Sequence, residues 1–387
     1  MTGLRVLVTA DAVGGVWQYS TELAAALAPL GVEAVIALMG PSPSPFAGCA
    51  GSSLSSLSLG EREGGAKRRT GEGDAHELVH VIPTNLPLDW LAPDAAAVHA
   101  AGDAIAALAR DVGADVIHLN SPALAAKTRF SVPVVAVGHG CVGTWWRAAN
   151  GSAPDPDHAW HTDLMARGLR AADAIVAPSA AFAAALQQVY ALPDTPTVVH
   201  NGRTPLPMIE AEAADHVFTA GRLWDAVKNT PLLDRIAARL PVPLRAAGST
   251  QGPHGERVDT AHLHLLGSLN IQGMARELAG RPVFVSAAGF EPFGLAVLEA
   301  AAAGCPLVLS GIDTFRELWT GAALFVESED EDGYLSAIAR VRSDAALRAH
   351  LGEAARLRSA RYTPQAMAGQ MAAIYAQVTA TPRRAAA

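Results

Sequence analysis

Two carboxylates stand out in the apolar stretch GFEPFGLAVLEAAAAGCPLVLS, residues 289–310. Glu299 is the only charged residue between Glu291 and Asp313, and its neighbours predict a helix that packs against a sheet. A buried carboxylate without a partner costs on the order of several kcal/mol, so a polar group must meet it. Two partners are open: the hydroxyl groups of a bound polyol, or a core arginine or backbone amide.

The residues between these carboxylates could hold an anion. Pro292 suits the first turn of a helix. The backbone amides of Phe293, Gly294 and Leu295 would then lack carbonyl partners within the helix. Unpaired amides at a helix N-terminus bind phosphate, and carboxylates accept hydrogen bonds from hydroxyl groups. The stretch therefore favours a site for a phosphate held among sugar hydroxyls.

Two cations follow the strand expected at residues 216–221. Arg222 and Lys228 lie in AGRLWDAVKN, residues 220–229, at the carboxyl end of that strand. Ligands bind at this edge of open α/β sheets. Solvated surface cations are the alternative, but the position at a strand end favours a role in binding phosphate.

A turn near the N-terminus is a weaker candidate. In DAVGGVWQY, residues 11–19, Gly14 and Gly15 follow the first strand and open a helix. They would let the backbone approach a ligand while the helix offers free N–H groups. A simple tight turn would look the same, and the dinucleotide fingerprint G-x-G-x-x-G is absent.

Together these features resemble the retaining glycosyltransferase family 4, of GT-B fold. The resemblance rests on the Glu-x7-Glu block EPFGLAVLE, the upstream GR…K, the HNG linker and the N-terminal GGV. It covers nearly the whole chain except residues 41–75. It implies two Rossmann-like domains facing a cleft, with a C-terminal helix that crosses back to the N-terminal domain.

The resemblance also implies roles for the residues of the second half. Glu291 would contact the donor sugar, Glu299 the ribose, and the amides before the helix the diphosphate. Arg222 and Lys228 would also bind the diphosphate. Their spacing is one residue wider than in much of the family, which makes Arg222 the firmer of the two assignments.

In the first half, the resemblance implies that Gly14 and Gly15 face the diphosphate or the acceptor. His139, in VVAVGHGCVGTWW, ends an expected strand and matches a histidine that lines the sugar pocket in many such enzymes. Trp145 and Trp146 could stack on a sugar, but packing residues are the more common reading of paired tryptophans.

We therefore expect a retaining, metal-independent glycosyltransferase, a hexosyltransferase, that moves a sugar from a nucleotide-diphosphate sugar to a hydroxyl acceptor. No cofactor is expected, because the acidic triplets DPD (155–157) and DED (330–332) read as solvated turns without a strand to fix them. A nucleotide-sugar epimerase of the same fold and a catalytically silent nucleotide-sugar binding protein remain alternatives.

Parallel strands must position these residues. Short apolar runs alternate with Ala- and Leu-rich segments along the chain, which is typical of an α/β fold built from βαβ units. Helices are expected at 94–111 and 179–190, capped by Asp94 and Ser179. Strands are expected at residues 4–10, 33–39, 80–83, 115–120, 132–138, 173–178, 195–201, 216–221, 243–248, 263–267, 281–286, 306–310 and 322–326.

The elements divide into two domains and a tail. Residues 1–204 form the expected acceptor domain, and residues 205–362 the nucleotide-sugar donor domain. Prolines and a glycine interrupt both periodicities near residue 205. Residues 363–387 form the cross-over helix and tail, with helical spacing at Met367, Met371, Ile374 and Val378. The Ser-, Gly- and Pro-rich residues 41–75 are expected to be a low-complexity insertion.

Composition limits the remaining classes. The 387 residues are 50% hydrophobic and carry a formal charge of −8, which argues against a nucleic-acid surface. No apolar run is long enough to span a bilayer, so a cytoplasmic location is expected, and no pattern indicates peripheral membrane contact. Cys49, Cys141 and Cys305 are far apart and predict neither disulfides nor a zinc site.

Overall fold

The computed structural model describes residues 3–11, 14–40, 79–152 and 154–381. The expected insertion at 41–75 and Cys49 lie outside these residues. The chain divides into two compact units. Unit 1 comprises Met1–Thr144, Ala153–Gly202 and Pro364–Ala387, and unit 2 comprises Trp145–Ser152 and Arg203–Thr363.

Unit 1 is built on a seven-stranded parallel sheet of order β3-β2-β1-β4-β5-β6-β7. Each strand expected in the first half is present. The strands are β1 (Leu4–Asp11), β2 (Val32–Met39), β3 (Val79–Pro83), β4 (Val116–Leu119), β5 (Val134–Val137), β6 (Ala174–Ala177) and β7 (Thr197–Val198).

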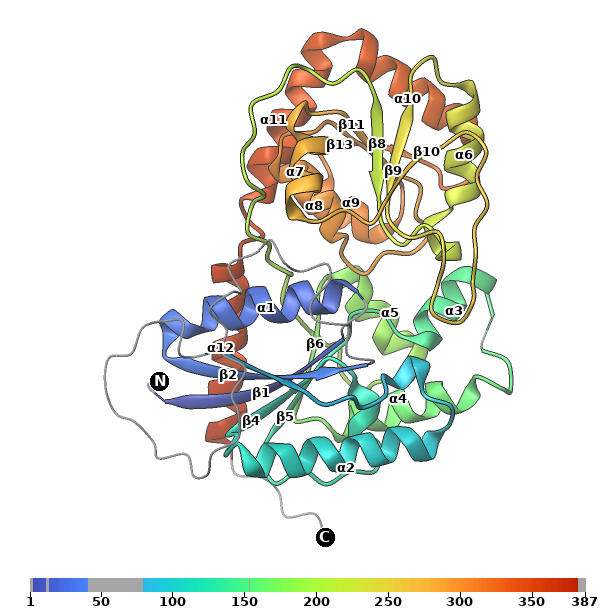
Figure 1. Cartoon of the computed structure of the whole chain (residues 1–387). Coiled ribbons are helices and arrows are strands. Elements are labelled where there is room, and N and C mark those ends of the chain that lie inside the picture. The colour runs from blue at the N-terminus through green and yellow to red at the C-terminus, as the bar shows by residue number, and fades with distance from the viewer. Residues whose placement is uncertain (1–2, 12–13, 41–78, 153, 382–387) are drawn as a thin grey trace. The chain divides into compact units, whose positions relative to one another are not determined.

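Helices cover both faces of this sheet (Figure 1). They are α1 (Gly15–Leu27), η1 (Ala28–Leu30), η5 (Asp89–Leu91), α2 (Ala95–Asp111), η6 (Pro122–Ala125), α3 (Val142–Asn150), α4 (Ala159–Ala171), α5 (Ala180–Tyr190) and α12 (Pro364–Ala380). The side chain of Asp94 accepts from Ala97 N, and that of Ser179 from Phe182 N, so both expected caps are confirmed. Helix α3 begins in unit 1, and from Trp145 onward its residues belong to unit 2.

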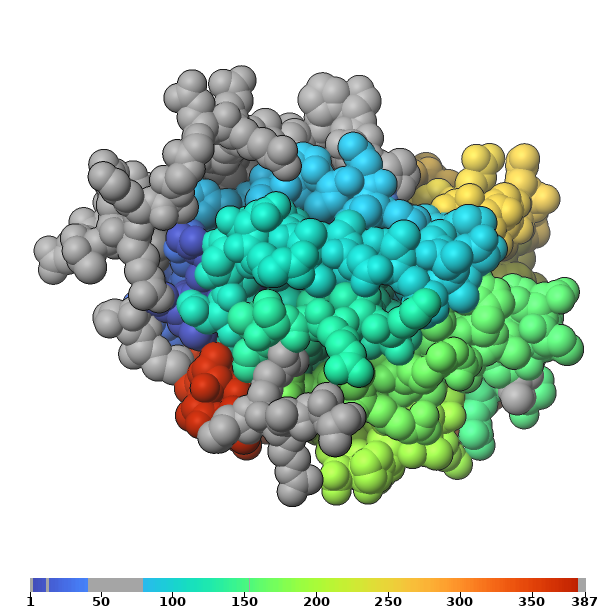
Figure 2. Space-filling model, turned by 90° about the horizontal axis from the view of Figure 1, so that it is seen from below, coloured from blue at the N-terminus to red at the C-terminus, as the bar shows by residue number. Residues whose placement is uncertain are grey.

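Alternating residues of β1 explain why both faces need cover. Leu7 packs in a cluster with residues of α2, whereas Val6 and Val8 pack with residues of α1 and α12 on the other face. The cyan-to-teal segment that includes α2 forms much of the surface seen from below (Figure 2). Strands buried on both faces read as continuous apolar runs, which is what the sequence showed.

The C-terminal helix α12 packs on the first domain, as expected. It contacts α1, and Met367, Met371 and Val378 are buried there while Ile374 is partly buried. Tyr375, which the spacing argument left out, is fully buried in the same cluster. The helix therefore completes the core of unit 1.

Unit 2 holds a second parallel sheet, of order β10-β9-β8-β11-β12-β13. Every strand expected in the second half is present. The strands are β8 (Val217–Ala220), β9 (Leu244–Ala247), β10 (His264–Gly267), β11 (Val283–Ser286), β12 (Leu307–Ser310) and β13 (Ala323–Val326).

The helices of unit 2 again cover two faces. They are η7 (Ala226–Lys228), α6 (Thr230–Arg239), α7 (Ile271–Ala279), α8 (Leu295–Ala302), α9 (Asp313–Trp319), α10 (Glu331–Ser343) and α11 (Ala345–Ser359). Phe218 and Leu309 pack with α8 and α9, whereas Val217 and Val308 pack with α6 and α10. Within the described ranges, no helix is long and apolar enough to cross a membrane.

Two local expectations were wrong. The helix after GFEPFG begins at Leu295 and not at Pro292, because Gly294 takes the N-cap position at φ 94°. The DED triplet is not a solvated turn: Asp330 caps α10 by accepting from Gly333 N, and Glu331 and Asp332 form ion pairs with Arg239. Acidic residues in a first turn are stabilised by the helix dipole.

Candidate active site

The loop after β8 is fixed by close backbone packing. Gly221 N donates to Ala247 O at 3.0 Å, which holds the loop against the end of β9. Gly248, at φ 136°, lies so near that an added Cβ would be 1.7 Å from Gly221 O. Only glycine fits there, and the tight crossing sets the direction in which the chain leaves β8.

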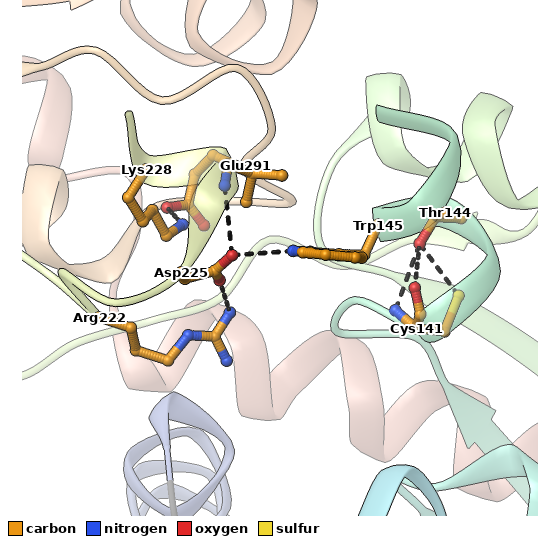
Figure 3. A network of polar contacts seen from close by, with 8 residues as sticks. Cys141, Thr144, Trp145, Arg222, Asp225, Lys228 and Glu291 are labelled. Carbon is orange, nitrogen blue, oxygen red and sulfur yellow. Dashed lines mark hydrogen bonds and ion pairs between the residues drawn. The ribbon is translucent and has the colours of Figure 1, made fainter. Parts of the chain in front are cut away.

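Asp225 is the centre of the polar contacts in this loop. Its side chain is 2% exposed and accepts from Arg222 Nη2 at 2.8 Å and from Val227 N at 3.3 Å. It also accepts from Trp145 Nε1 at 2.8 Å. Figure 3 shows Arg222 and Trp145 reaching this carboxylate from different sides. The buried charge is thus compensated by donors that converge on it.

Lys228 and Glu291 form the second pair of the site. Lys228 Nζ lies 2.7 Å from Glu291 Oε2, and both side chains are half-buried (Figure 3). Gly289 N donates to Val227 O at 2.8 Å, which ties the loop that carries Glu291 to η7. The structure therefore brings Arg222, Lys228 and Glu291 together in unit 2, as parts of one connected group.

The turn before α8 needs glycine. Gly294 has φ 94°, and a Cβ there would lie 3.1 Å from the ring of Phe315 and 3.3 Å from Glu291 Cγ. Phe293 is buried and packs edge-on against Tyr362. By helix geometry, the amides that lack intrahelical partners are those from Gly294 to residue 297. This set includes the expected amides of Gly294 and Leu295 but not that of Phe293. Leu295 is the first helical residue.

Glu299 has a protein partner. Arg203 Nε lies 2.8 Å from Glu299 Oε1, and both side chains are 9% exposed. Arg203 is itself held by its backbone N–H, which donates to Tyr362 O at 3.1 Å. Of the two alternatives drawn from the sequence, a core arginine is the one observed. A contact between Glu299 and a ligand stays a prediction.

The remaining candidates belong to unit 1. Gly14 is the N-cap of α1 with an extended backbone, and an added Cβ would meet none of the described atoms within 4 Å. Gly15 is exposed as the first residue of α1. The local backbone conformation therefore requires glycine at neither position. Because glycine has no side chain, however, neither residue covers the N-terminus of α1.

His139 follows β5 and is held by two contacts. Its Nε2 lies 2.8 Å from Asn120 Oδ1, and its ring packs edge-on against Tyr19 with centroids 4.3 Å apart. Burial, together with neighbouring His118, lowers the pKa of His139 to about 3. The imidazole is therefore neutral at physiological pH and cannot serve there as a cation for phosphate.

The remaining candidates from the sequence are the possible metal ligands and the cysteines. Among the described residues, no group of three or more His, Cys, Asp or Glu side chains could hold a metal ion. In the DPD triplet, Asp155 lies 2.6 Å from His158 Nδ1. Burial raises the pKa of Cys141 and raises that of Cys305 to about 12, so both thiols stay protonated. Thiolates, not thiols, are the reactive form.

Sequence reasoning missed two residues that hold the site, Asp225 and Arg203, and did not foresee the contact between Trp145 and Asp225. Asp225 stands between Arg222 and Lys228 in AGRLWDAVKN, so a carboxylate between two cations was a usable signal. Arg203 directly follows the HNG linker, but nothing in the local sequence points to Glu299, 96 positions away. Trp145 likewise binds Asp225 through a long-range contact.

Comparison with known proteins gives two family matches. Residues 13–205 match the family described as Glycosyltransferase Family 4, and residues 259–358 match Glycosyl transferases group 1. The phosphatidyl-myo-inositol mannosyltransferase of Mycolicibacterium smegmatis is 31% identical over 121 residues, 30% of this chain and 31% of that protein. The match thus spans about a third of the length of this curated relative.

Solved structures resemble the whole chain. Sucrose-phosphate synthase from Thermosynechococcus elongatus has a TM-score of 0.75 at 19% identity, covering 98% of this chain and all of that one. Anabaena Alr3699/HepE in complex with UDP-glucose has a TM-score of 0.68 at 18% identity, covering 97% of this chain and all of that one. At these identities the likeness establishes a shared fold.

We expect the Arg203–Glu299 pair to matter for stability. Arg203→Ala should lower the free energy of unfolding by about 3 kcal/mol or more, because it removes the cation from a nearly buried carboxylate. Chemical denaturation measures the change. The matched control is Arg356→Ala, whose pair with Glu353 is about half exposed (53% and 54%). Arg356→Ala should lower the free energy of unfolding by less than about 1 kcal/mol. Equal losses in the two variants would contradict the importance of the Arg203–Glu299 pair.

Proposed function

Because the chain belongs to glycosyltransferase family 4 and has the GT-B fold, we propose that it transfers a sugar from a nucleotide-diphosphate sugar to a hydroxyl acceptor. The observation that carries this proposal is the connected group in unit 2. Arg222 and Lys228, each paired with a carboxylate, lie with Glu291 beside the N-terminus of α8. Cations and unpaired amides in one place suit a diphosphate.

Arg222 is the better placed of the two cations for an incoming phosphate. Its side chain is 50% exposed and gives only Nη2 to Asp225, so the guanidinium retains donors for a second anion. Its guanidinium also lies over the ring of Trp224, 5.6 Å from the centroid. These contacts orient the planar fork, which can bind phosphate through two parallel hydrogen bonds.

Relatives support a nucleotide sugar as the donor. Anabaena Alr3699/HepE is solved with UDP-glucose and with UDP and glucose, and the mycobacterial relative is a mannosyltransferase by name. We propose that the donor of this chain is likewise a nucleotide-diphosphate hexose. Residues 205–362 would bind it, with Glu291 accepting from sugar hydroxyls and Glu299 from the ribose. Residues 1–204 would receive the acceptor, with Gly14 and Gly15 facing the diphosphate or the acceptor and His139 lining the sugar pocket.

The mechanism we propose keeps the configuration at the anomeric carbon. The bond from this carbon to the diphosphate oxygen breaks as the acceptor oxygen bonds to the same face. The acceptor proton passes to the departing diphosphate oxygen, so no protein base is needed. Arg222, Lys228 and the first amides of α8 stabilise the charge that grows on the diphosphate.

We further propose that the transfer needs no metal. A diphosphate leaving group requires positive charge or strong hydrogen-bond donors where its own charge develops. Here two cationic side chains and a helix N-terminus can supply them without a divalent ion. Lys228 contributes a compact point charge, and Arg222 contributes directed hydrogen bonds.

A turnover assay separates this proposal from its rivals. The protein is incubated with UDP-glucose, UDP-N-acetylglucosamine or GDP-mannose in excess EDTA, with a panel of hydroxyl acceptors. We expect release of nucleoside diphosphate and a glycosylated product with the donor's anomeric configuration. An epimerised donor would indicate a nucleotide-sugar epimerase. Binding of the donor without turnover across the acceptor panel would indicate a catalytically silent nucleotide-sugar binding protein. Activity lost in EDTA and restored by magnesium or manganese would contradict metal independence.

We expect Arg222→Ala to reduce turnover about 10²–10³-fold, which is roughly 2.7–4 kcal/mol, by analogy with the loss of an oxyanion donor. The donor dissociation constant should change far less, because the contact strengthens as the bond breaks. Arg222→Lys should not restore the rate, because an ammonium cannot replace the bidentate fork. Steady-state kinetics and donor titration measure both quantities.

The matched control is Arg235→Ala. Arg235 is similarly exposed, at 56%, and pairs with Glu331 on the same unit. This control should leave turnover and donor affinity unchanged, and melting temperatures should show that every variant is folded. Near-normal turnover in folded Arg222→Ala would refute the diphosphate role of this arginine.

A further inference from the structure

Unit 1 contains a polar cluster around His139, and two of its members, His118 and Asn120, have no role in the proposed function. His118 in β4 is fully buried, and Asn120 follows the same strand. Asn120 Oδ1 lies 3.0 Å from His118 Nε2 and 2.8 Å from His139 Nε2. One amide oxygen therefore faces a nitrogen of each of two imidazole rings.

The orientation of the Asn120 amide follows from its other neighbours. Its Nδ2 lies 2.6 Å from Thr9 O and 3.0 Å from Ser20 Oγ. A backbone carbonyl oxygen can only accept, so the atom that faces Thr9 O must be the NH2 group. The carbonyl end of the side chain is thereby turned toward the two histidines.

The amide orientation decides the tautomer of both rings. An amide oxygen can only accept, so Nε2 of His118 and of His139 must each carry a proton. Burial lowers the pKa of His118 to about 4, and burial with neighbouring His118 lowers that of His139 to about 3. Both rings are therefore neutral near pH 7, and neither Nδ1 carries a proton.

The two Nδ1 atoms differ in their surroundings. His118 Nδ1 lies 2.6 Å from the hydroxyl of Tyr375 in α12, which therefore donates to it. For His139, no residue in the described part of the chain forms a hydrogen bond with Nδ1. The edge-on contact with Tyr19 further orients the His139 ring. His139 thus keeps one lone pair for a group outside this cluster.

We propose that Asn120 is a positioning residue, which fixes His139 as the Nε2–H tautomer so that Nδ1 is a hydrogen-bond acceptor. The consequence for binding rests on the proposed function: Nδ1 accepts from a hydroxyl group of the sugar or of the acceptor. An acceptor-only atom at that place, such as a phosphate or carboxylate oxygen, would face the lone pair and be disfavoured. His139 would thereby favour a hydroxyl over an anionic group.

Nitrogen NMR of histidine-labelled protein tests the tautomer directly. We expect His139 and His118 each to show a protonated Nε2 and an unprotonated Nδ1 near pH 7, assigned by the signals lost in His139→Gln and His118→Gln. A protonated Nδ1 on His139, or averaging between tautomers, would overturn the proposal. The measurement needs no donor, so it stands or falls independently of transferase activity.

Variants at residue 120 test the role of Asn120 itself. Asn120→Ala removes the acceptor, so the His139 signals should average between tautomers. Asn120→Asp keeps an acceptor oxygen in place, so His139 should retain its Nε2 proton. This variant also tests the role of residue 120 if the alanine variant is unfolded. Gln188→Ala, at an exposed position of α5 in unit 1, is the control and should change neither ring. A fixed Nε2–H tautomer in folded Asn120→Ala would refute the assignment, as would loss of that proton in Asn120→Asp.

The ligand contact has its own readout. Whichever of UDP-glucose, UDP-N-acetylglucosamine or GDP-mannose releases nucleoside diphosphate in the turnover assay is added at saturation, with and without acceptor. The His139 Nδ1 resonance should move and that of His118 should stay. A donor that is consumed while neither mixture moves His139 Nδ1 would contradict the hydroxyl contact and leave the tautomer result intact.

Discussion

The buried carboxylate of Asp225 is the contact on which the candidate donor site depends. A charge that is 2% exposed must be met by donors, and Arg222, Trp145 and the amide of Val227 provide them. Arg222 and Val227 belong to the same loop as Asp225, whereas Trp145 comes from α3. One carboxylate therefore orients the guanidinium and fixes the turn that carries Lys228. The site is thus ordered by an interaction that need not touch a ligand at all.

Two glycines set the backbone geometry of the same site. Gly248 permits the close crossing behind Arg222, and Gly294 permits the turn that brings Glu291 toward Lys228. Each position would place a Cβ too near its neighbours, and both have positive φ angles. The backbone therefore sets the spacing between the cations and the helix N-terminus, while the ion pairs set the direction of the side chains.

The sequence predicted the fold well, because strands buried on both faces leave long apolar runs, and because Asp94 and Ser179 are local caps. It was less informative about the partners of charged groups. The Arg203–Glu299 pair joins positions far apart in the chain, and only the folded sheet makes them neighbours. The sequence placed the start of α8 at Pro292, because proline suits a first turn. The helix begins instead at Leu295, because Gly294 takes the N-cap position with a positive φ.

The central claim is that Arg222, Lys228 and the N-terminus of α8 together hold the diphosphate of the donor. Calorimetric titration of UDP, UMP, GDP and GMP into the wild type and Lys228→Met tests it most directly. In the wild type the diphosphates should bind more tightly than the monophosphates. That difference should shrink by about 1.5–3 kcal/mol in the variant, the usual worth of a hydrogen bond to a charged group. An unchanged difference, with the variant folded, would contradict the account.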